Sequence, residues 1–314
     1  MSEIKKIATR DSYGSALAEL GKEADDLVVL DADLAATKTG IFQKAFPDRH
    51  IDCGIAESNM MGITAGLASA GKVPFVSSFA MFAAGRAFEQ VRNSIGYPHL
   101  NVKIGATHAG LSVGEDGATH QCNEDLALMR VIPGMTVISP LDDVEARAAV
   151  RAAYALDGPV YLRFGRLAVP VINDRADYKF EIGKGVTLRD GADLTILATG
   201  LCVSQALRAA ESLKADGIDA GVINIHTIKP LDAELVVKAA GKTGNMVTVE
   251  EHSILGGLGS AVAEVLAEQC PVRMLRIGVQ DVFGESGPAV QLLEKYGLDA
   301  GGIYNKVTAF MKNA

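Results

Sequence analysis

Short apolar runs alternate with longer helix-like stretches along almost all of this 314-residue chain. In the first half, the strand-like runs cover residues 27–30, 73–76, 102–104, 136–138 and 160–164, and the helical patterns cover 13–20, 60–70, 86–95 and 144–156. Strands that alternate with helices form βαβ units, which build a parallel sheet covered by helices on both faces. The alternation therefore predicts an α/β fold.

The alternation is interrupted once, near residue 167. The segment LAVPVINDRADYKFEIG contains Pro, Asn and a charge cluster without a clear period, which is typical of a linker. Beyond it, strand-like runs at 193–198, 220–225, 246–249 and 272–277 alternate with helical patterns at 203–214, 235–240, 260–269 and 286–314. Since a domain has roughly 150 residues, we expect two domains, 1–170 and 184–314, each a mostly parallel sheet covered by helices.

Composition excludes several classes of protein. Aromatic residues make up 5% of the chain, Trp is absent and the formal net charge is -8, so a base-stacking nucleic-acid surface is not expected. No apolar run approaches the ~20 residues that a membrane span needs. The start, MSEIKKIATR, lacks the apolar segment of an export signal, and the four cysteines lie far apart without a CxxC pair. We therefore expect a cytoplasmic protein that binds neither nucleic acid nor membranes.

Ligands of open α/β sheets bind beyond the carboxyl ends of the strands, so the loops at those ends are the candidates. Asp31 and Asp33 end the first strand-like run, and Thr37 and Thr39 follow. Turn and helix-capping chemistry explains such residues equally well. Glu57 begins an apolar, Gly- and Ala-rich helix. The helix dipole favours an acid there, but a buried carboxylate must be paired or used in chemistry.

Two further loops carry candidate residues. Phe79 and Phe82 are three residues apart and could share a face, either as core packing or as a stacking platform for a flat heterocycle. The loop 107–121 combines two histidines, two acids and three glycines between a strand-like run and a helical pattern at 125–131. Histidines with acids supply proton transfer or ligand hydrogen bonds. A metal site is the competing interpretation, with His108, Asp116 and His120 as ligands.

Charged and glycine-rich segments elsewhere are less specific. Arg163 and Arg166 end the last strand-like run of the first domain, where Arg can clamp an anion or form a salt bridge to the linker. The segment 256–260, GGLGS, only faintly resembles a dinucleotide loop, and close helix packing is favoured there. Residues 250–252, Glu-Glu-His, end a strand and receive no assignment.

Taken together, these segments resemble the transketolase family. The matching segments are KIATRDSYG, DADL, GIAESNM, SSFAMFAAGRAFEQVR, GEDGATHQ and RIGVQDVFGESGPAVQLLEKYGL. They follow the order of the pyrimidine-binding and C-terminal domains of that family over essentially the whole chain. Full-length transketolases also have an N-terminal domain, whose GDG…N motif holds Mg²⁺ and the diphosphate of thiamine diphosphate, and no such motif occurs in this sequence. The chain thus resembles the C-terminal subunit of a split, two-chain transketolase.

The resemblance implies a role for each matching residue. Glu57 hydrogen-bonds the pyrimidine ring nitrogen of thiamine diphosphate, Phe82 stacks on that ring with Phe79 beside it, and Asp33 lies near the cofactor. His120 lies near the pyrimidine amino group and the substrate, so Glu57 and His120 are the implied catalytic residues. No metal ligand is expected on this chain, because the Mg²⁺ ligands belong to the partner subunit.

The substrate is implied to be a sugar phosphate. Asp116 binds a sugar hydroxyl. The remaining sugar and phosphate ligands are His108, Arg166, Arg10 and Thr37. One departure from the family is Gly85, where some members carry a Tyr in the pyrimidine pocket.

The implied activity is transfer of a two-carbon ketol unit from a ketose phosphate to an aldose phosphate, a reaction of the pentose phosphate pathway. Thiamine diphosphate supplies the carbon nucleophile, and a desolvated carboxyl group held against its pyrimidine ring favours the imino form that takes up a proton. Three alternatives stay open. They are a 1-deoxyxylulose-5-phosphate synthase-like fragment, a 2-oxo acid dehydrogenase beta subunit and a non-catalytic assembly or regulatory subunit. Glu115 beside Asp116 and the FGESG segment favour transketolase.

Assembly is the last expectation. In the family, one chain holds the pyrimidine and another holds the diphosphate of the cofactor. The Gly- and Ala-rich helix at 60–70 suits such an interface because small side chains let helices approach closely. We expect a homodimer that recruits two copies of an N-terminal, diphosphate-binding subunit into a two-fold symmetric heterotetramer.

Overall fold

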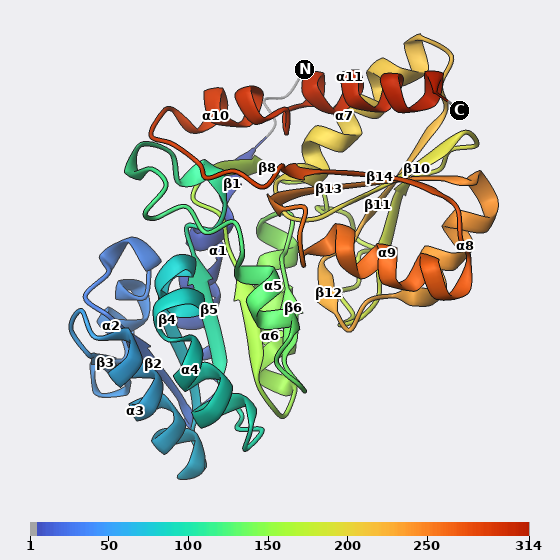
Figure 1. Ribbon diagram of the computed structural model, residues 1–314. Helices are drawn as coiled ribbons and strands as arrows, with labels where there is room; N and C mark the ends of the chain where they lie inside the picture. Colours follow the sequence, from blue (N-terminus) through green and yellow to red (C-terminus); the bar gives the residue numbers. More distant parts are fainter. Residues whose placement is uncertain (1–4, 314) are drawn as a thin grey trace.

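Two sheets lie side by side, each flanked by helices (Figure 1). The computed structural model describes residues 5–313, so residues 1–4 and 314, which the expected domains include, lie outside the described part. The first sheet has seven strands in the order β12-β6-β7-β5-β4-β2-β3. These strands are β2 (Leu27–Asp31), β3 (His50–Asp52), β4 (Val73–Phe79), β5 (Lys103–Thr107), β6 (Thr136–Ile138), β7 (Val160–Arg163) and β12 (Thr227–Lys229). All neighbouring pairs are parallel except β12 with β6.

Helices cover both faces of this sheet. They are α1 (Thr9–Leu20), α2 (Gly40–Ala45), α3 (Glu57–Ser69), α4 (Phe88–Gln90), α5 (Asp125–Arg130) and α6 (Asp143–Ala155). On one face α1 packs against α6 over a core that includes Tyr13 and Leu17. On the other face α3 and α5 enclose a second core that includes Met60 and Met61. Burial of apolar side chains on both faces explains why the strands are continuous apolar runs.

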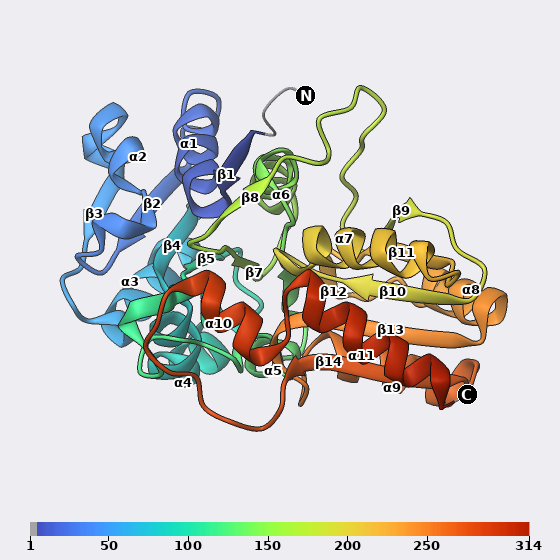
Figure 2. The same ribbon diagram turned by 90° about the horizontal axis from the view of Figure 1, so that it is seen from above.

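The second sheet has five strands in the order β14-β13-β10-β11-β9, and only β9 is antiparallel to its neighbour. The strands are β9 (Val186–Arg189), β10 (Leu194–Ala198), β11 (Ala220–Asn224), β13 (Asn245–Ser253) and β14 (Arg273–Val279). The helices are α7 (Cys202–Ala215), α8 (Ala233–Thr243), α9 (Leu258–Gln269), α10 (Ala289–Tyr296) and α11 (Ala300–Lys312). Figure 2 shows α10 and α11 in front of the sheet's edge, with α10 reaching the first half of the chain.

The predicted α/β fold with two mostly parallel sheets is confirmed, and the differences concern short elements. The segment read as a linker begins with a strand, β8 (Ala168–Pro170), which pairs antiparallel with β1 (Lys6–Ala8). The helical pattern at 86–95 belongs to a longer stretch from Met81 to Gly96, in which wide π-type turns, η3 (Met81–Arg86) and η4 (Val91–Gly96), flank α4. Strands of three residues are too short for any periodicity to show in the sequence.

A polar junction ties the linker and the second sheet to α6. Asp142 caps α6 and accepts hydrogen bonds from the backbone N–H groups of residues 172–173, at 2.7 Å each. Glu145 is fully buried, and its carboxylate accepts from the Tyr178 hydroxyl at 2.6 Å and from the Asn224 amide at 2.8 Å. A buried carboxylate is costly unless its oxygens are satisfied, so these contacts fix where the two halves meet.

No helix within residues 5–313 is both long enough and apolar enough to cross a membrane.

Candidate functional site

The candidate site begins where β4 and β5 end. Phe79 and Thr107, the last residues of these strands, face each other in register. His108 follows directly, and its ring stacks on the ring of Phe79 with 3.9 Å between centroids. The backbone φ of His108 is 58°, a left-handed conformation that is uncommon outside glycine. The carboxyl edge of the sheet therefore carries an aromatic ring in contact with an imidazole, as the loop rule predicts.

Phe82 extends this cluster of rings. It lies in η3, with its ring 6.1 Å from that of Phe79 and inclined by 14°, so the two rings share a face as their spacing predicts. His120 meets the Phe82 ring edge-on at 5.3 Å. The guanidinium of Arg86 lies over the Phe82 ring, 4.5 Å from its centroid, in a cation–π contact. Residues from three separate segments thus meet around Phe82.

Glu57 joins the cluster through Arg86. It is the first residue of α3 and only 2% exposed, and its Oε2 accepts a hydrogen bond from Arg86 Nη1 at 2.8 Å. The Arg86 side chain is 49% exposed. The half-exposed guanidinium can turn toward water, but a ligand that displaces it has to supply a hydrogen bond in its place, because Glu57 would otherwise be an unpaired buried carboxylate. The pair therefore satisfies Glu57 without sealing it from a ligand.

Arg10 and His108 form a second polar pair beside the rings. Arg10 Nη1 donates to His108 Nε2 at 2.7 Å, and His108 Nδ1 lies 2.9 Å from the Thr107 hydroxyl. This network assigns the proton to Nδ1. Burial, together with the charges of Arg10, Arg166 and Lys38, lowers the pKa of His108 to about 3. His108 is therefore a neutral imidazole at physiological pH, suited to hydrogen bonding rather than to holding a positive charge.

The loop after β5 carries the acids and the second histidine. It includes η5 (Leu111–Asp116) and turns at Gly114 and Gly117, whose φ angles of 85° and 76° require glycine. Arg166 donates to the carbonyl of Val113, and the same Nη1 lies 3.8 Å from Asp116 Oδ2. Asp116 is 44% exposed, so its carboxylate stays accessible to a polar ligand.

Two predicted residues lie outside this cluster. Thr37 is buried in a network in which it contacts the Thr39 hydroxyl at 3.2 Å, and Thr39 in turn donates to Asp31 at 2.5 Å. Asp33 is exposed at the end of β2, with a backbone φ of 55°, and its N–H donates to Asp52 at 3.0 Å. Contacts thus connect six of the ten predicted residues, counting Arg86 as the link to Glu57, namely Glu57, Phe79, Phe82, His108, His120 and Arg10. Arg166 and Asp116 form a separate pair, and the charge of Arg166 acts on Arg10 and His108.

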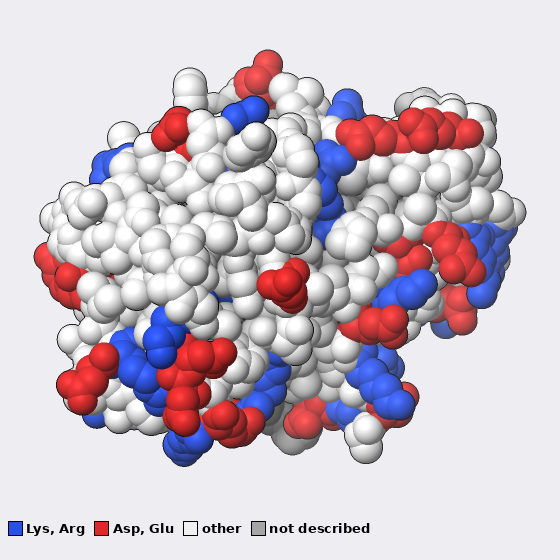
Figure 3. All heavy atoms as spheres, turned by 90° about the horizontal axis from the view of Figure 1, so that it is seen from below, with Lys and Arg blue, Asp and Glu red and all other residues white. Residues whose placement is uncertain are grey.

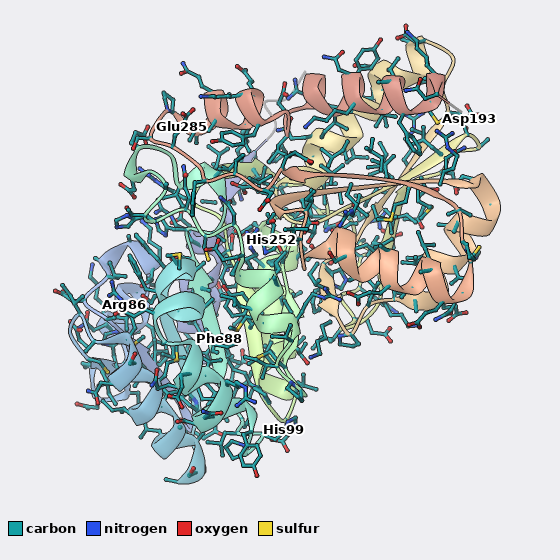
Figure 4. The ribbon with its side chains drawn as sticks, viewed as in Figure 1. Arg86, Phe88, His99, Asp193, His252 and Glu285 are labelled. Carbon is teal, nitrogen blue, oxygen red and sulfur yellow. The ribbon has the colours of Figure 1, made fainter. Side chains whose placement is uncertain are left out.

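An open pocket of about 880 Å³ borders the cluster. It is lined by Met81, Phe82 and Arg86 of η3, by residues of the segment 118–124 and by the segment 281–284 that follows β14. Figure 4 shows Arg86 on the first half of the molecule, Glu285 on the segment after β14 and His252 between the two sheets. The second half of the chain therefore contributes one wall of the pocket.

The structure also bears on two alternatives that the sequence left open, a metal site in the loop 107–121 and an anion clamp at Arg163. Within residues 5–313, no group of three or more His, Cys, Asp or Glu side chains is arranged to hold a metal ion. Arg163 is buried and paired with Asp125 of α5 at 2.8 Å, so it forms a salt bridge, although not to the linker as one prediction had it, and it is not free to clamp an anion. Arg86 was not among the predicted site residues, although it lies four residues after Phe82, because its pairing with Glu57 spans 29 residues of sequence.

Comparison with known proteins identifies the class. The family model for the pyrimidine-binding domain of transketolase matches residues 5–171, and that for the C-terminal domain of transketolase matches residues 183–303. The chain therefore belongs to the transketolase family, and it comprises the pyrimidine-binding and C-terminal domains of that fold.

Individual relatives indicate which type of transketolase chain this is. A putative transketolase C-terminal section of Methanocaldococcus jannaschii is 52% identical over 96% of both chains. A 6-deoxy-6-sulfo-D-fructose transketolase subunit of a Clostridium species is 49% identical over 93% of this chain and 90% of its own. A solved structure described as a split gene transketolase, an inactive beta4 tetramer, superposes with a TM-score of 0.89 at 53% identity, covering 98% of this chain and 99% of that one. The chain is thus a C-terminal section of the split type within this family.

Proposed function

We propose that this chain is the C-terminal subunit of a thiamine-diphosphate-dependent transketolase, active only with an N-terminal, diphosphate-binding subunit. The reaction is transfer of a two-carbon ketol unit from a ketose phosphate to an aldose phosphate. One observation carries the proposal. Arg86 contacts both the buried carboxylate of Glu57 and the ring of Phe82, so a carboxyl group and an aromatic face lie close together. Related chains of the split type support the same reading.

The residues of the site fit the pyrimidine end of the cofactor. A flat heterocycle needs an aromatic face and a hydrogen-bonding group at its edge. Phe82 offers the face, and Glu57, 2% exposed, offers a desolvated carboxyl group. When bound, thiamine diphosphate supplies the carbon nucleophile that cleaves a ketose. The diphosphate and its Mg²⁺ are assigned to the partner subunit.

The other side chains act on the sugar. Arg166, which is 37% exposed, binds the phosphate, since a guanidinium makes strong charge-assisted bonds to phosphate oxygens. Neutral His108 accepts from a sugar hydroxyl at Nε2 when Arg10 releases that nitrogen, and Asp116 accepts from another hydroxyl. His120, at the edge of Phe82, moves protons to and from the reacting hydroxyls. We further propose that Asp33 and Thr37 complete the sugar and cofactor contacts once the partner is bound.

Reconstitution tests the proposal. The chain is purified alone and then mixed with an N-terminal transketolase subunit from the same organism, and ketol transfer is measured with thiamine diphosphate and Mg²⁺. We expect activity only in the mixture. The related beta4 tetramer described as inactive supports this expectation. Ketol transfer by the isolated chain would overturn the need for a partner. A complex that forms but does not transfer ketol units would overturn the activity itself.

A further inference from the structure

The two glutamates of the Glu-Glu-His segment at residues 250–252 form hydrogen bonds to different halves of the molecule. Glu250 and Glu251 are adjacent in β13 and are 1% and 3% exposed. The Glu250 carboxylate accepts from the backbone N–H groups of Leu258 and Gly259, at 2.7 Å each, and so caps α9 inside its own domain. Glu251 instead points across the domain boundary, where its Oε1 accepts from the backbone N–H of Ser112.

Ser112 belongs to the loop that carries Asp116 and His120. The same loop is held at its far end by Gln121, whose amide donates to the carbonyl of Glu285 at 2.9 Å. Both anchors, Glu251 and Glu285, belong to the second half of the chain. Glu285 lies on the segment that follows β14 (Figure 4).

The surroundings of Glu251 keep its carboxylate in place. The Arg163 guanidinium donates to the backbone carbonyl of Glu251 at 2.9 Å and to Asp125 at 2.8 Å. Burial raises the pKa of Glu251 to about 7, opposed by the charge of Arg163 and by the Ser112 hydrogen bond. Glu251 also approaches Gly110 so closely that a Cβ at that position would overlap its carboxyl group. A carboxyl group is expensive to bury, and this one lies against the loop instead of against its own domain.

We propose that Glu251 is a positioning residue, through which the C-terminal domain holds the substrate-binding loop in its working geometry. The roles of Asp116 and His120 in this inference rest on the proposed function. The claim that Glu251 holds the loop rests only on the contacts described above. Glu251 thus gives the C-terminal domain a role in the reaction, which is to hold the loop that carries Asp116 and His120.

The test compares Glu251→Ala and Glu251→Gln with the matched control Glu250→Gln. Hydrogen–deuterium exchange is measured on each chain in its complex with the partner, in peptides that cover 111–121 and in peptides that cover 257–260. Glu251→Ala leaves the Ser112 N–H buried without an acceptor, so exchange in 111–121 should rise, whereas Glu251→Gln keeps an acceptor and should restore most of the protection. Glu250→Gln should loosen only 257–260, because its contacts stay at α9.

Kinetics supply the second readout. Glu251→Ala should lower kcat/KM for ketol transfer by about 10- to 100-fold, with the Gln variant within a few-fold of wild type and thiamine diphosphate affinity unchanged. Wild-type exchange in 111–121 for Glu251→Ala, or equal loosening of that loop by Glu250→Gln, would overturn the inference. If Glu251→Ala does not fold, Glu251→Gln decides, since its loop must still exchange measurably faster than wild type. If the wild-type complex is inactive but the exchange pattern is as expected, the proposed function is rejected, whereas the positioning role of Glu251 is supported.

Discussion

At the scale of single residues, Glu57 and Arg86 form an ion pair between a buried carboxylate and a half-exposed guanidinium. The buried carboxylate needs a partner, and the half-exposed guanidinium supplies one without occupying the interior. Glu57→Gln keeps the size of the side chain but removes its ability to relay a proton, so ketol transfer by the complex should fall by about 100-fold or more. Folding should be little affected, because Arg86 can turn toward water.

The matched control is Glu89→Gln, which alters an exposed glutamate of α4, close in sequence to Arg86. It should retain wild-type turnover. Circular dichroism would report the fold of both variants, and near-normal activity of Glu57→Gln would mean that the cofactor lies elsewhere.

In the proposed function, Arg166 binds the phosphate of the substrate. Removal of a charge-assisted hydrogen bond costs roughly 1.5–3 kcal/mol, or about 10- to 150-fold in binding. Arg166→Ala should therefore raise KM for phosphorylated sugars by about that factor and affect hydroxypyruvate much less. Arg175→Ala, which removes an arginine of the linker, is the control and should leave both values unchanged. An equal loss for both substrates would indicate that Arg166 acts by holding the Val113 carbonyl.

The sequence predicted those site residues whose environment is set by residues close to them in the chain. Phe79 and Phe82 lie close together in sequence, on either side of the end of β4, and their rings stack, and Glu57 is buried at the start of an apolar helix. Arg86 and Glu251 could not be assigned this way, since each acts through a partner that is far along the chain, across 29 and 139 residues. The π-type turns around Phe82 also shift the side chains from the positions that a regular helix would give.

At the scale of elements, Glu145 makes the junction between α6, the linker and β11 sensitive to pH. Burial raises the pKa of Glu145 to about 7, helped by the neighbouring charge of Asp142 and opposed by hydrogen bonds from Tyr178, Leu141 and Asn224. A carboxyl group whose pKa is higher in the folded state than in the unfolded state holds its proton more tightly when folded. The stability that it contributes therefore falls as pH rises from the unfolded value of about 4.3 to about 7.

The test uses Glu145→Gln, which does not titrate. The free energy of unfolding of the wild type, relative to this variant, should decrease by on the order of 2 kcal/mol between pH 5 and pH 8. Urea unfolding followed by circular dichroism measures it. Glu211→Gln, at an exposed position of α7, should show the same difference at both pH values. A Glu145→Gln difference that rises with pH would contradict the assigned direction.

The outer face of α3 is the element-scale candidate for self-association. Gly62, Ile63 and Gly66 are exposed on it, and a Cβ placed at Gly66 would meet no atom within 4 Å. Seen from below, the molecule shows a wide area with few charged side chains, and most of the charges in this view lie along its lower edge and right side (Figure 3). Gly66→Leu should therefore leave the chain folded but block its self-association.

The control for this substitution is Gly241→Leu, the same change at an equally open position on α8 of the other domain. Light scattering should report smaller particles only for Gly66→Leu, while circular dichroism reports a native fold for both. An unfolded Gly66→Leu variant would instead indicate packing inside the domain, and an unchanged particle mass would place the interface elsewhere.

At the scale of the whole molecule, the proposed function requires a second kind of chain to complete the site. The pocket is open, and one wall is an exposed apolar segment in which Val282 and Phe283 are 56% and 87% exposed. We expect the active complex to contain two copies of each chain. Light scattering of the purified complex should give that mass, and activity should fall on dilution as the complex dissociates. A complex of one copy of each chain that stays fully active at high dilution would contradict this assembly.

The position of β12 has a consequence for synthesis. This strand is encoded about 60 residues after the last β-strand of the first half, β8, yet it forms the edge of the first sheet beside β6. While the ribosome makes the intervening segment, a few seconds at about 5–20 residues per second, the edge of β6 stays unpaired. An open strand edge is a template for pairing with other nascent chains. Translation speed between residues 171 and 227 therefore sets how long each new molecule is exposed to aggregation before its first sheet closes.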